Sequence, residues 1–188
     1  FGKQLTELTQ LRQLQIYASR LSGTIPSAVH TLTALQTLDL PDTYISGTIP
    51  AALGTHLTVL GELSLYKCRL SGTLPPEIGQ LGRLKSLYLD SNTLDGAVPD
   101  LSGCRSLKVL RLTNNSFDSL PAAAPGNITH FYLDQNPLNA SAADLSRLTH
   151  GLLNLHTLAV GIVNVPIILE SSMDYPNPRC NIPSAESR

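Results

Sequence analysis

The sequence lacks an excess of charge of either sign. Its 188 residues include 13 lysines and arginines and 14 aspartates and glutamates, which gives a formal net charge of −1. Nucleic acids and anionic membrane surfaces are bound through concentrated basic faces, so the sequence predicts neither as a partner. It also lacks a run of about 18 apolar residues, which a membrane-spanning helix requires. Membrane attachment is therefore expected only through segments outside this chain.

Motifs of catalysis are missing too. No GxSxG, HExxH, P-loop or glycine-rich dinucleotide pattern follows a predicted strand, so the sequence predicts no enzyme and no cofactor. Cysteine is scarce, and no CxxC pair indicates a zinc or redox site. The three cysteines are Cys68, Cys104 and Cys180.

Two pairs of side chains are conceivable metal ligands. His130 and His156 are expected to be neighbours in successive units of the repeat described below, and Asp39 and Asp42 belong to one strand segment. Ordinary surface polarity explains both pairs, so no metal site is predicted.

What the sequence does contain is an internal repeat. An LxxLxL pattern recurs every 21 to 27 residues, beginning at Leu11, Leu35, Leu60, Leu84, Leu107, Ile128 and Leu155. Its period-2 alternation predicts one short strand per unit, and a repeat of this length predicts a solenoid with parallel strands. We therefore predict an α/β repeat over residues 1–165, with about seven coils and a partial first coil before Leu11. Residues 166–188 are predicted to form a C-terminal cap or tail.

The ninth position of each unit holds a small polar group or an amide in six of the seven coils. The residues are Ser19, Thr43, Cys68, Asn92, Asn115, Asn136 and, in the last coil, Val163. We expect these polar side chains to turn inward and bond the backbone of a bend that would otherwise be buried without partners. They are called the ladder residues below. Cys68 is thus interpreted as a ladder residue, and Cys104 as a small packed side chain.

A motif of the form apolar-Ser-Gly-Thr-apolar-Pro follows the strand in several coils, as in "LSGTIP" from Leu21 and "ISGTIP" from Ile45. Glycine suits a tight turn out of the sheet, and proline suits the first turn of a short helix. The segment "SAADLSRLTHGLL" begins with a Ser-x-x-Asp pattern before helical apolar spacing. It predicts a longer α-helix in the sixth coil.

These residues together resemble the plant-type leucine-rich repeat, LxxLxLxxNxLxGxIPxxLxxL, from Leu5 to about Val165. The resemblance implies a right-handed solenoid with a parallel β-sheet on the concave face and short 3₁₀ or α turns on the convex face. This class of repeat occurs in extracellular domains of receptor-like kinases and receptor-like proteins, in polygalacturonase inhibitors and in protist surface antigens. It implies a non-enzymatic extracellular or cell-surface module that binds a protein or peptide. The alternative is a structural or adhesive spacer in a surface or matrix assembly.

Residues between and just after the inward leucines are expected on the concave face. Tyrosine and arginine contribute much of the energy of protein interfaces, although tyrosine is also common in half-buried strands. Arg111 is expected between the rings of Tyr88 and Tyr132, with about 4.8 Å between strands. Asp90 and Asp134 lie diagonally and could instead satisfy Arg111 internally. The candidate binding residues are Tyr17, Tyr66, Tyr88, Asp90, Arg111, Tyr132 and Asp134.

Three N-glycosylation sequons begin at Asn114, Asn127 and Asn139. All three fall at positions expected to face solvent, where a glycan can be carried, and they favour a secreted or cell-surface glycoprotein. Cys180 fits a C-terminal cap whose partner cysteine lies outside this chain.

The apolar N-terminal edge of the repeat has no evident cap. Leu5 and Leu8 resemble the convex end of a coil without its strand, so a neighbouring domain or subunit is expected to cover Leu5, Leu8 and Leu11. The predicted concave sheet offers only about 500 Å², against about 800 Å² per partner in a stable interface. The isolated segment is therefore expected to bind weakly or to self-associate.

Overall fold

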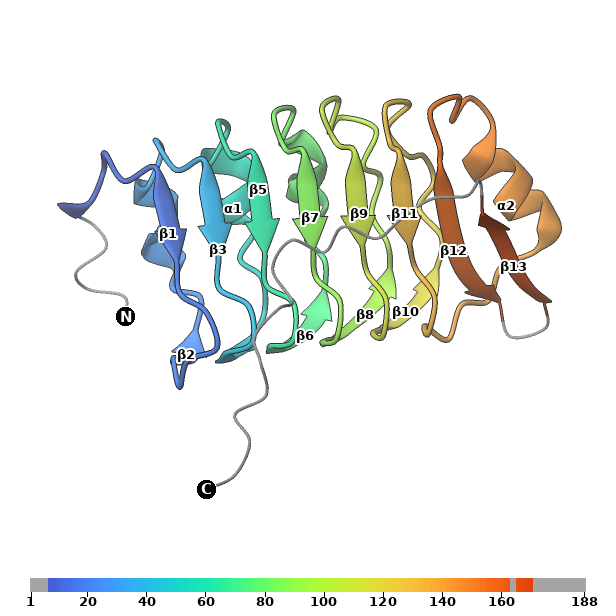
Figure 1. The fold of residues 1–188 in the computed structure, drawn as a ribbon. Helices are drawn as coiled ribbons and strands as arrows, with labels where there is room; N and C mark the ends of the chain where they lie inside the picture. The colour runs from blue at the N-terminus through green and yellow to red at the C-terminus, as the bar shows by residue number, and fades with distance from the viewer. Residues whose placement is uncertain (1–6, 163–164, 171–188) are drawn as a thin grey trace, which may run out of the picture.

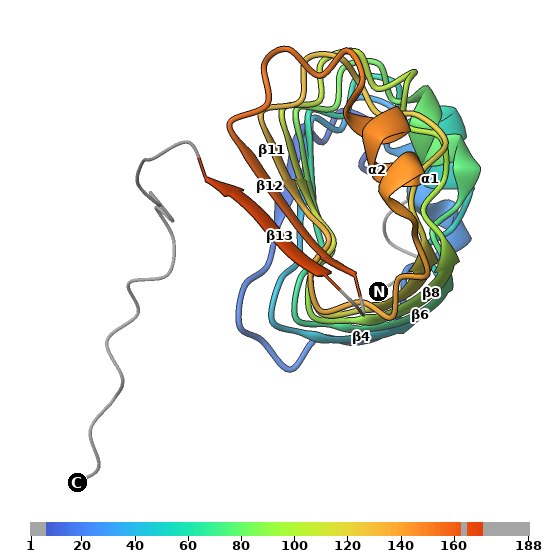
Figure 2. The ribbon, with the colours of Figure 1, turned by 90° about the vertical axis from the view of Figure 1, so that its right-hand side faces the viewer.

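The computed structural model describes residues 7–162 and 165–170. In this part the chain winds as a solenoid, with one strand of each coil on one wall and the helical turns on the opposite wall (Figure 1, Figure 2). The first sheet has the strand order β1-β3-β5-β7-β9-β11-β12-β13. Its strands are β1 Gln13–Gln15, β3 Thr37–Asp39, β5 Glu62–Ser64, β7 Ser86–Tyr88, β9 Val109–Arg111, β11 His130–Tyr132, β12 Thr157–Ile162 and β13 Val165–Glu170.

Strands β1 to β12 of this sheet pair in parallel, each with the strand of the next coil. The predicted parallel sheet is therefore confirmed. Strand β13 returns antiparallel to β12 and pairs with it from Thr157 and Glu170 to Ile162 and Val165. The solvent side of this first sheet is hereafter the concave face.

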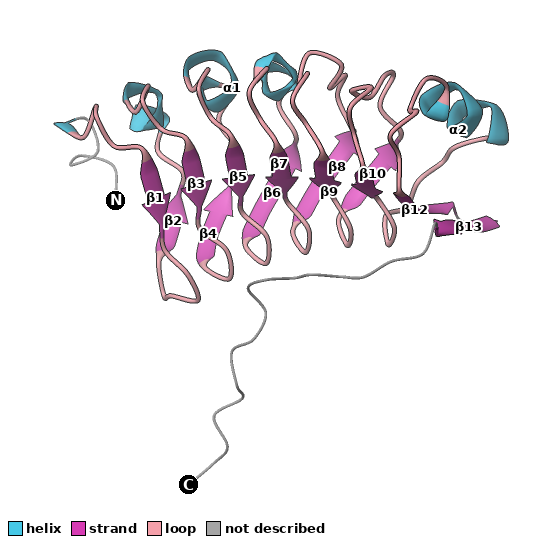
Figure 3. Cartoon of the chain, turned by 45° about the horizontal axis from the view of Figure 1, so that its top comes forward, coloured by secondary structure: helices cyan, strands magenta, loops and turns pink. Residues whose placement is uncertain are grey.

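A second parallel sheet, which the sequence analysis did not predict, lies on the adjoining wall (Figure 3). Its strands are β2 Ser22–Thr24, β4 Tyr44–Gly47, β6 Arg69–Thr73, β8 Thr93–Ala97 and β10 Ser116–Ser119. The Ser-Gly-Thr segments, expected only to turn, form β2 and part of β6, and the equivalent segments of the other coils form β4, β8 and β10. Gly72 does adopt the expected positive φ, 73°, and a Cβ there would lie 3.2 Å from the Thr48 methyl of the preceding coil. Glycine thus also lets neighbouring coils pack closely.

Helical turns follow three of the motif prolines, Pro26, Pro50 and Pro75, as predicted, whereas only hydrogen-bonded turns follow Pro99. The helical turns are the 3₁₀ helices η2 Ser27–Thr31 and η3 Pro76–Gln80 and the short helix α1 Ala52–His56. The longer helix predicted in the sixth coil is α2 Ala142–Thr149, and it begins with a capping box. The Ser141 hydroxyl accepts from the Asp144 N–H, and the Asp144 carboxylate accepts from the Ser141 N–H at 3.0 Å. Two otherwise unpaired backbone donors are satisfied in this way.

A continuous apolar core fills the space between the walls and includes the fully buried Phe117 and Phe131. Burial of this surface is the main driving force for folding. At the N-terminal end the core is less covered: Leu8 is 46% exposed and Leu11 is only partly buried. Leu5 lies outside the described residues. No helix in the described part of the chain is long and apolar enough to cross a membrane.

The ladder residues satisfy the bends as predicted. The Oδ1 of Asn115 accepts from the Leu94 N–H at 3.0 Å, and its Nδ2 donates to the carbonyls of Leu89 and Leu112 at 2.9 and 3.1 Å. Asn92 and Asn136 repeat this arrangement. The residue before each ladder residue has a positive φ of 41° to 58°: Ala18, Asp42, Lys67, Ser91, Asn114 and Gln135. Such a bend costs non-glycine residues about 1–2 kcal/mol, which the ladder bonds help to offset.

The three earlier ladder positions use other groups, and the last lies outside the described residues. The Ser19 hydroxyl accepts from the Leu21 N–H at 3.2 Å. The Thr43 hydroxyl donates to the Leu40 carbonyl at 3.0 Å, and the Cys68 thiol contacts the same carbonyl at 3.3 Å. Burial raises the pKa of the Cys68 thiol. The contact of its thiol with the Leu40 carbonyl confirms the interpretation of Cys68 as a ladder residue, and a raised pKa disfavours the nucleophilic thiolate. Val163 is not among the described residues.

Candidate functional site

The row Tyr88, Arg111 and Tyr132 is assembled by the first sheet. Tyr88 pairs in register with Arg111, and Arg111 with Tyr132, across β7, β9 and β11. All three side chains are half-buried on the concave face, while the alternate residues Leu87, Leu110 and Phe131 are in the core. The period-2 alternation thus sorts this row to the solvent side.

Arg111 is held by two neighbours. Its Nε lies 3.5 Å from Oδ1 of Asp90, and its guanidinium carbon lies 5.7 Å from the centroid of the Tyr132 ring. Within the described residues the guanidinium makes no corresponding stacking contact with Tyr88, so it lies against one ring and a carboxylate instead of between two rings. A third of the Arg111 side chain, 33%, remains exposed.

The two diagonal aspartates have different roles. Asp90 is 9% exposed and forms the ion pair with Arg111. Asp134 accepts a hydrogen bond from the Thr113 hydroxyl at 2.7 Å. Burial raises the pKa of Asp90, and the charges of Arg111 and Lys67 oppose this increase only in part. The internal pairing that the sequence left open is therefore made by Asp90.

The raised pKa of Asp90 gives a pH-dependent prediction. Because its pKa in the fold lies above the unfolded value, the ionised carboxylate costs stability at neutral pH, and this cost disappears as the pH falls through the raised pKa. We expect Asp90→Asn to have a higher free energy of unfolding than the wild type at pH 7, with the difference shrinking at pH 4. Urea unfolding at both pH values measures it, with the exposed Asp95→Asn as control. A less stable Asp90→Asn at pH 7 would contradict the assignment.

The remaining predicted concave residues lie in the first and third coils. Tyr17 is 46% exposed, and Tyr66 is half-buried. In the second and third coils little of the row between the inward leucines is accessible to a partner, because Asp39 and Ser64 are each only 2% exposed. The half-exposed cluster of ring and guanidinium groups therefore belongs to the fourth to sixth coils.

The structure extends this cluster with two histidines. The rings of His130 and Tyr132 stack with centroids 6.4 Å apart, and His130 stacks on His156 at 6.0 Å. Burial and the neighbouring His156 lower the pKa of His130. The repeat spacing predicted that the two histidines lie together, and a metal site was the one role that this pair suggested. The period-2 relation of His130 to Tyr132 is the signal that assigns His130 to the concave face.

No cluster of three or more histidine, cysteine, aspartate or glutamate side chains that could hold a metal occurs in residues 7–162 and 165–170. Cys104 is fully buried and its thiol contacts the Ile78 carbonyl at 3.1 Å. Burial raises its pKa to about 11, so it packs as an apolar side chain, as predicted. Cys180 lies outside the described residues.

All three sequon asparagines are exposed. Asn114 occupies a left-handed bend at φ 56°, a conformation that asparagine tolerates well. The Asn127 amide donates to the Arg105 carbonyl at 3.0 Å. Asn139 shortly precedes α2, and Ser141, the third residue of its sequon, caps that helix. The expected solvent exposure of the sequons is confirmed.

Comparison with known proteins identifies the repeat. The profile of the family described as Leucine Rich Repeat matches residues 34–56 and 60–81. The plant peptide hormone receptor RGFR1, in complex with RGF2, matches with a TM-score of 0.73 and 25% identity over 84% of this chain and 25% of that chain. These matches support a leucine-rich repeat of the plant type in this chain.

Two further structures show the breadth of this likeness. The ectodomain of the Arabidopsis thaliana receptor kinase GASSHO1/SCHENGEN3, in complex with CASPARIAN STRIP INTEGRITY FACTOR 2, has 30% identity and a TM-score of 0.70 over 79% of this chain and 18% of that one. A leucine-rich repeat protein of Leptospira interrogans has 31% identity and a TM-score of 0.67 over 82% of this chain and 38% of that one. No curated protein matches. The chain thus spans a quarter or less of the two receptor chains.

Proposed function

We propose that this chain is a non-enzymatic extracellular recognition module that binds a protein or peptide through its concave face. The observation that carries the proposal is Arg111, a partly exposed guanidinium already oriented by Asp90 and the Tyr132 ring. Orienting a long side chain before binding reduces the entropy lost on association. The receptors that match this fold, with RGF2 and CASPARIAN STRIP INTEGRITY FACTOR 2 bound to them, support a peptide or protein as the partner.

The proposed site gives each residue a part. Arg111 would donate to a carboxylate or carbonyl of the partner, since guanidinium offers paired planar donors. Tyr88 and Tyr132 flank it and would cover the apolar part of the ligand. Tyr17 and Tyr66 extend the surface toward the first coil, and Asp90 and Asp134 would set the acceptor pattern.

Selection of displayed random peptides against the immobilised segment tests this proposal. We expect enriched sequences whose free peptides slow hydrogen exchange in β7, β9 and β11. A spacer or adhesive element would give no enriched sequences, or protection limited to the second sheet and the convex turns. Either of those results would contradict concave-face recognition.

The exposed sequons support a secreted or cell-surface location. We expect protein from the native source to carry carbohydrate on at least one of Asn114, Asn127 and Asn139. Intact mass before and after glycosidase treatment measures this directly. An unchanged mass would remove the support that the sequons give to an extracellular location.

We also propose that a neighbouring domain or subunit covers the N-terminal edge. The exposed Leu8 and partly buried Leu11 support this, together with the incompletely buried Leu14, Ile16 and Leu21. Sedimentation of the isolated segment is expected to show self-association, which replacement of Leu8 by a charged residue should weaken. A stable monomer with nanomolar affinity for one partner would contradict this proposal.

A further inference from the structure

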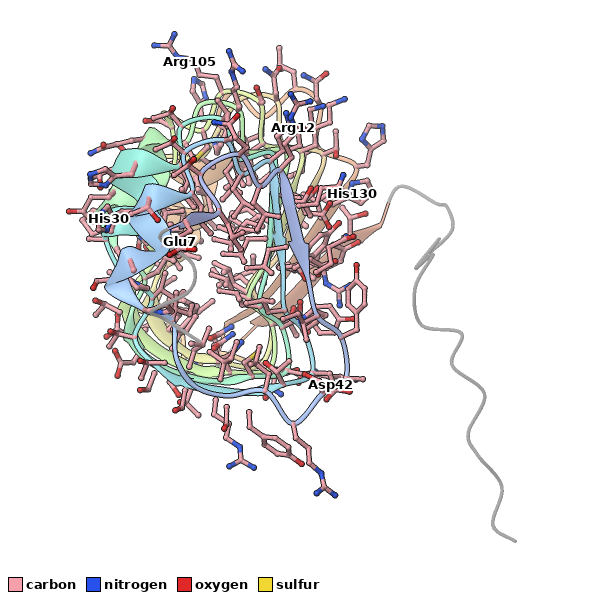
Figure 4. The ribbon with its side chains drawn as sticks, turned by 90° about the vertical axis from the view of Figure 1, so that its left-hand side faces the viewer. Glu7, Arg12, His30, Asp42, Arg105 and His130 are labelled. Carbon is pink, nitrogen blue, oxygen red and sulfur yellow. The ribbon has the colours of Figure 1, made fainter. Side chains whose placement is uncertain are left out.

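A polar recess of about 410 Å³ lies at the edge where the first sheet turns into the second, in the first three coils. Figure 4 shows Asp42 at this edge and Arg105 at the opposite one. The recess is built from three neighbouring positions in each of three successive coils. Its lining is Ala18, Ser19, Arg20, Asp42, Thr43, Tyr44, Lys67, Cys68 and Arg69.

The backbone holds these positions in register. Ala18, Asp42 and Lys67 are the bend residues with φ of 41°, 52° and 52°. Two residues after each bend residue comes the position just before the first apolar residue of the apolar-Ser-Gly-Thr motif. This position holds Arg20, Tyr44 and Arg69. Successive coils are about 4.8 Å apart, so a tyrosine stands between two arginine positions. The solenoid therefore holds the backbone of these residues at a fixed, regular spacing.

The recess carries more positive than negative charge. Arg20, Lys67 and Arg69 are exposed cations, and Asp42 is the acidic residue of the lining. Within the described residues, ion pairs join Arg111 to Asp90 and Arg147 to Asp144, so none of these three cations has a carboxylate within ion-pair distance. Lys67 also acts electrostatically on Asp90 at the concave face.

One of the arginines is already oriented. The guanidinium carbon of Arg69 lies 4.4 Å from the centroid of the Tyr44 ring, a cation–π distance, and Tyr44 is 46% exposed. Stacking uses the face of the guanidinium and leaves its edge, which carries the N–H donors, for a planar acceptor. A carboxylate matches that edge with two parallel hydrogen bonds.

We infer that this recess binds an acidic side chain of a protein or peptide partner. The basic positions end after the third coil: the equivalent residues of the next coils are Ser91 with Thr93 and Asn114 with Ser116. Exposed Asp95 and Asp118 follow on the second sheet. A long polyanion lying along the solenoid would meet these carboxylates, whereas a short acidic segment fits within three coils. The recess shares no residue with the proposed concave site, so an experiment can refute one of the two proposals without refuting the other.

Titration of the ¹⁵N-labelled segment with an acetylated and amidated triglutamate peptide tests the inference. We expect shifts concentrated at Arg20, Tyr44, Lys67 and Arg69, and no comparable shifts with the triglutamine peptide. Arg69→Gln and Arg20→Gln should each weaken binding about tenfold at low salt, because each removes a charge-assisted hydrogen-bond donor. Both side chains are exposed, and unchanged spectra elsewhere would confirm that the variants fold.

The opposite edge supplies an internal control. Its exposed cations include Arg83, Lys85, Arg105 and Lys108, and within the described residues none of these four makes a cation–π contact. Lys108→Gln should leave triglutamate affinity unchanged. Equal shifts at both edges, equal binding of triglutamine, or full binding by Arg69→Gln would each overturn the inference. Tighter binding of a sulfated oligosaccharide than of triglutamate at the recess would overturn the assignment to a peptide.

Discussion

Replacing Gly79 with alanine is expected to destabilise the protein by about 3 kcal/mol, at the upper end of overpacking effects. Gly79 lies in η3, where a Cβ would fall well inside van der Waals contact of the Asp100 carbonyl oxygen of the next coil. Gly103 faces the Gly79 carbonyl in the same way. The clash involves backbone on both sides and not a flexible side chain, so neighbouring coils must separate to relieve it.

The matched control is Gly82→Ala. A Cβ on Gly82 would lie 3.8 Å from the Gly103 carbonyl oxygen, an ordinary contact, and its cost should stay within about 0.5 kcal/mol. Thermal unfolding is expected to separate the two variants by roughly 5–10 °C, since each kcal/mol shifts Tm by about 2–4 °C at this size. Equal melting temperatures would show that the coils are not packed backbone against backbone on the convex wall.

Asn115→Ala is expected to cost about 3–4 kcal/mol. The change leaves the Leu94 N–H and the Leu89 and Leu112 carbonyls without the bonds that the amide supplies, and each buried polar group left unpaired costs about 1–3 kcal/mol. Asn115→Thr should be intermediate, because Thr43 occupies the equivalent position and still bonds one carbonyl.

Chemical unfolding of unglycosylated protein measures this series. Asn139→Ala is the control, because that side chain is exposed and a surface change of this kind is expected within about 0.5 kcal/mol. The expected order of stability is wild type and Asn139→Ala, then Asn115→Thr, then Asn115→Ala. If Asn115→Ala were as stable as Asn139→Ala, the ladder would not hold the bends.

Features that depend on local spacing, whether repeated in each coil or present in one coil, could be predicted from the sequence. The inward leucines, the ladder residues and the capping box of α2 depend on local spacing, and the structure confirms them. The second sheet could not be predicted in this way. Four of its five strands contain glycine, which is depleted in strands, and their pairing arises only when the next coil stacks on them.

Side-chain partners in the candidate site were harder to predict. Spacing placed Arg111 near Tyr88, Tyr132 and Asp90, but which of them it contacts depends on side-chain conformation and burial. The structure gives it Asp90 and Tyr132. The edge recess was open to prediction, because Arg20, Tyr44 and Arg69 occupy one repeat position.

Affinity of a selected peptide for Arg111→Ala and Arg147→Ala tests concave-face recognition most directly. Both arginines form an ion pair with an aspartate, at 3.5 Å for Arg111 and 3.3 Å for Arg147, but Arg147 belongs to α2 on the convex side. We predict that Arg111→Ala weakens binding at least tenfold, about 1.4 kcal/mol, when affinity is measured well below its Tm, which should fall because the buried Asp90 loses its cation, and that Arg147→Ala binds like the wild type. Unchanged affinity of Arg111→Ala, or an equal loss in both variants, would contradict the account.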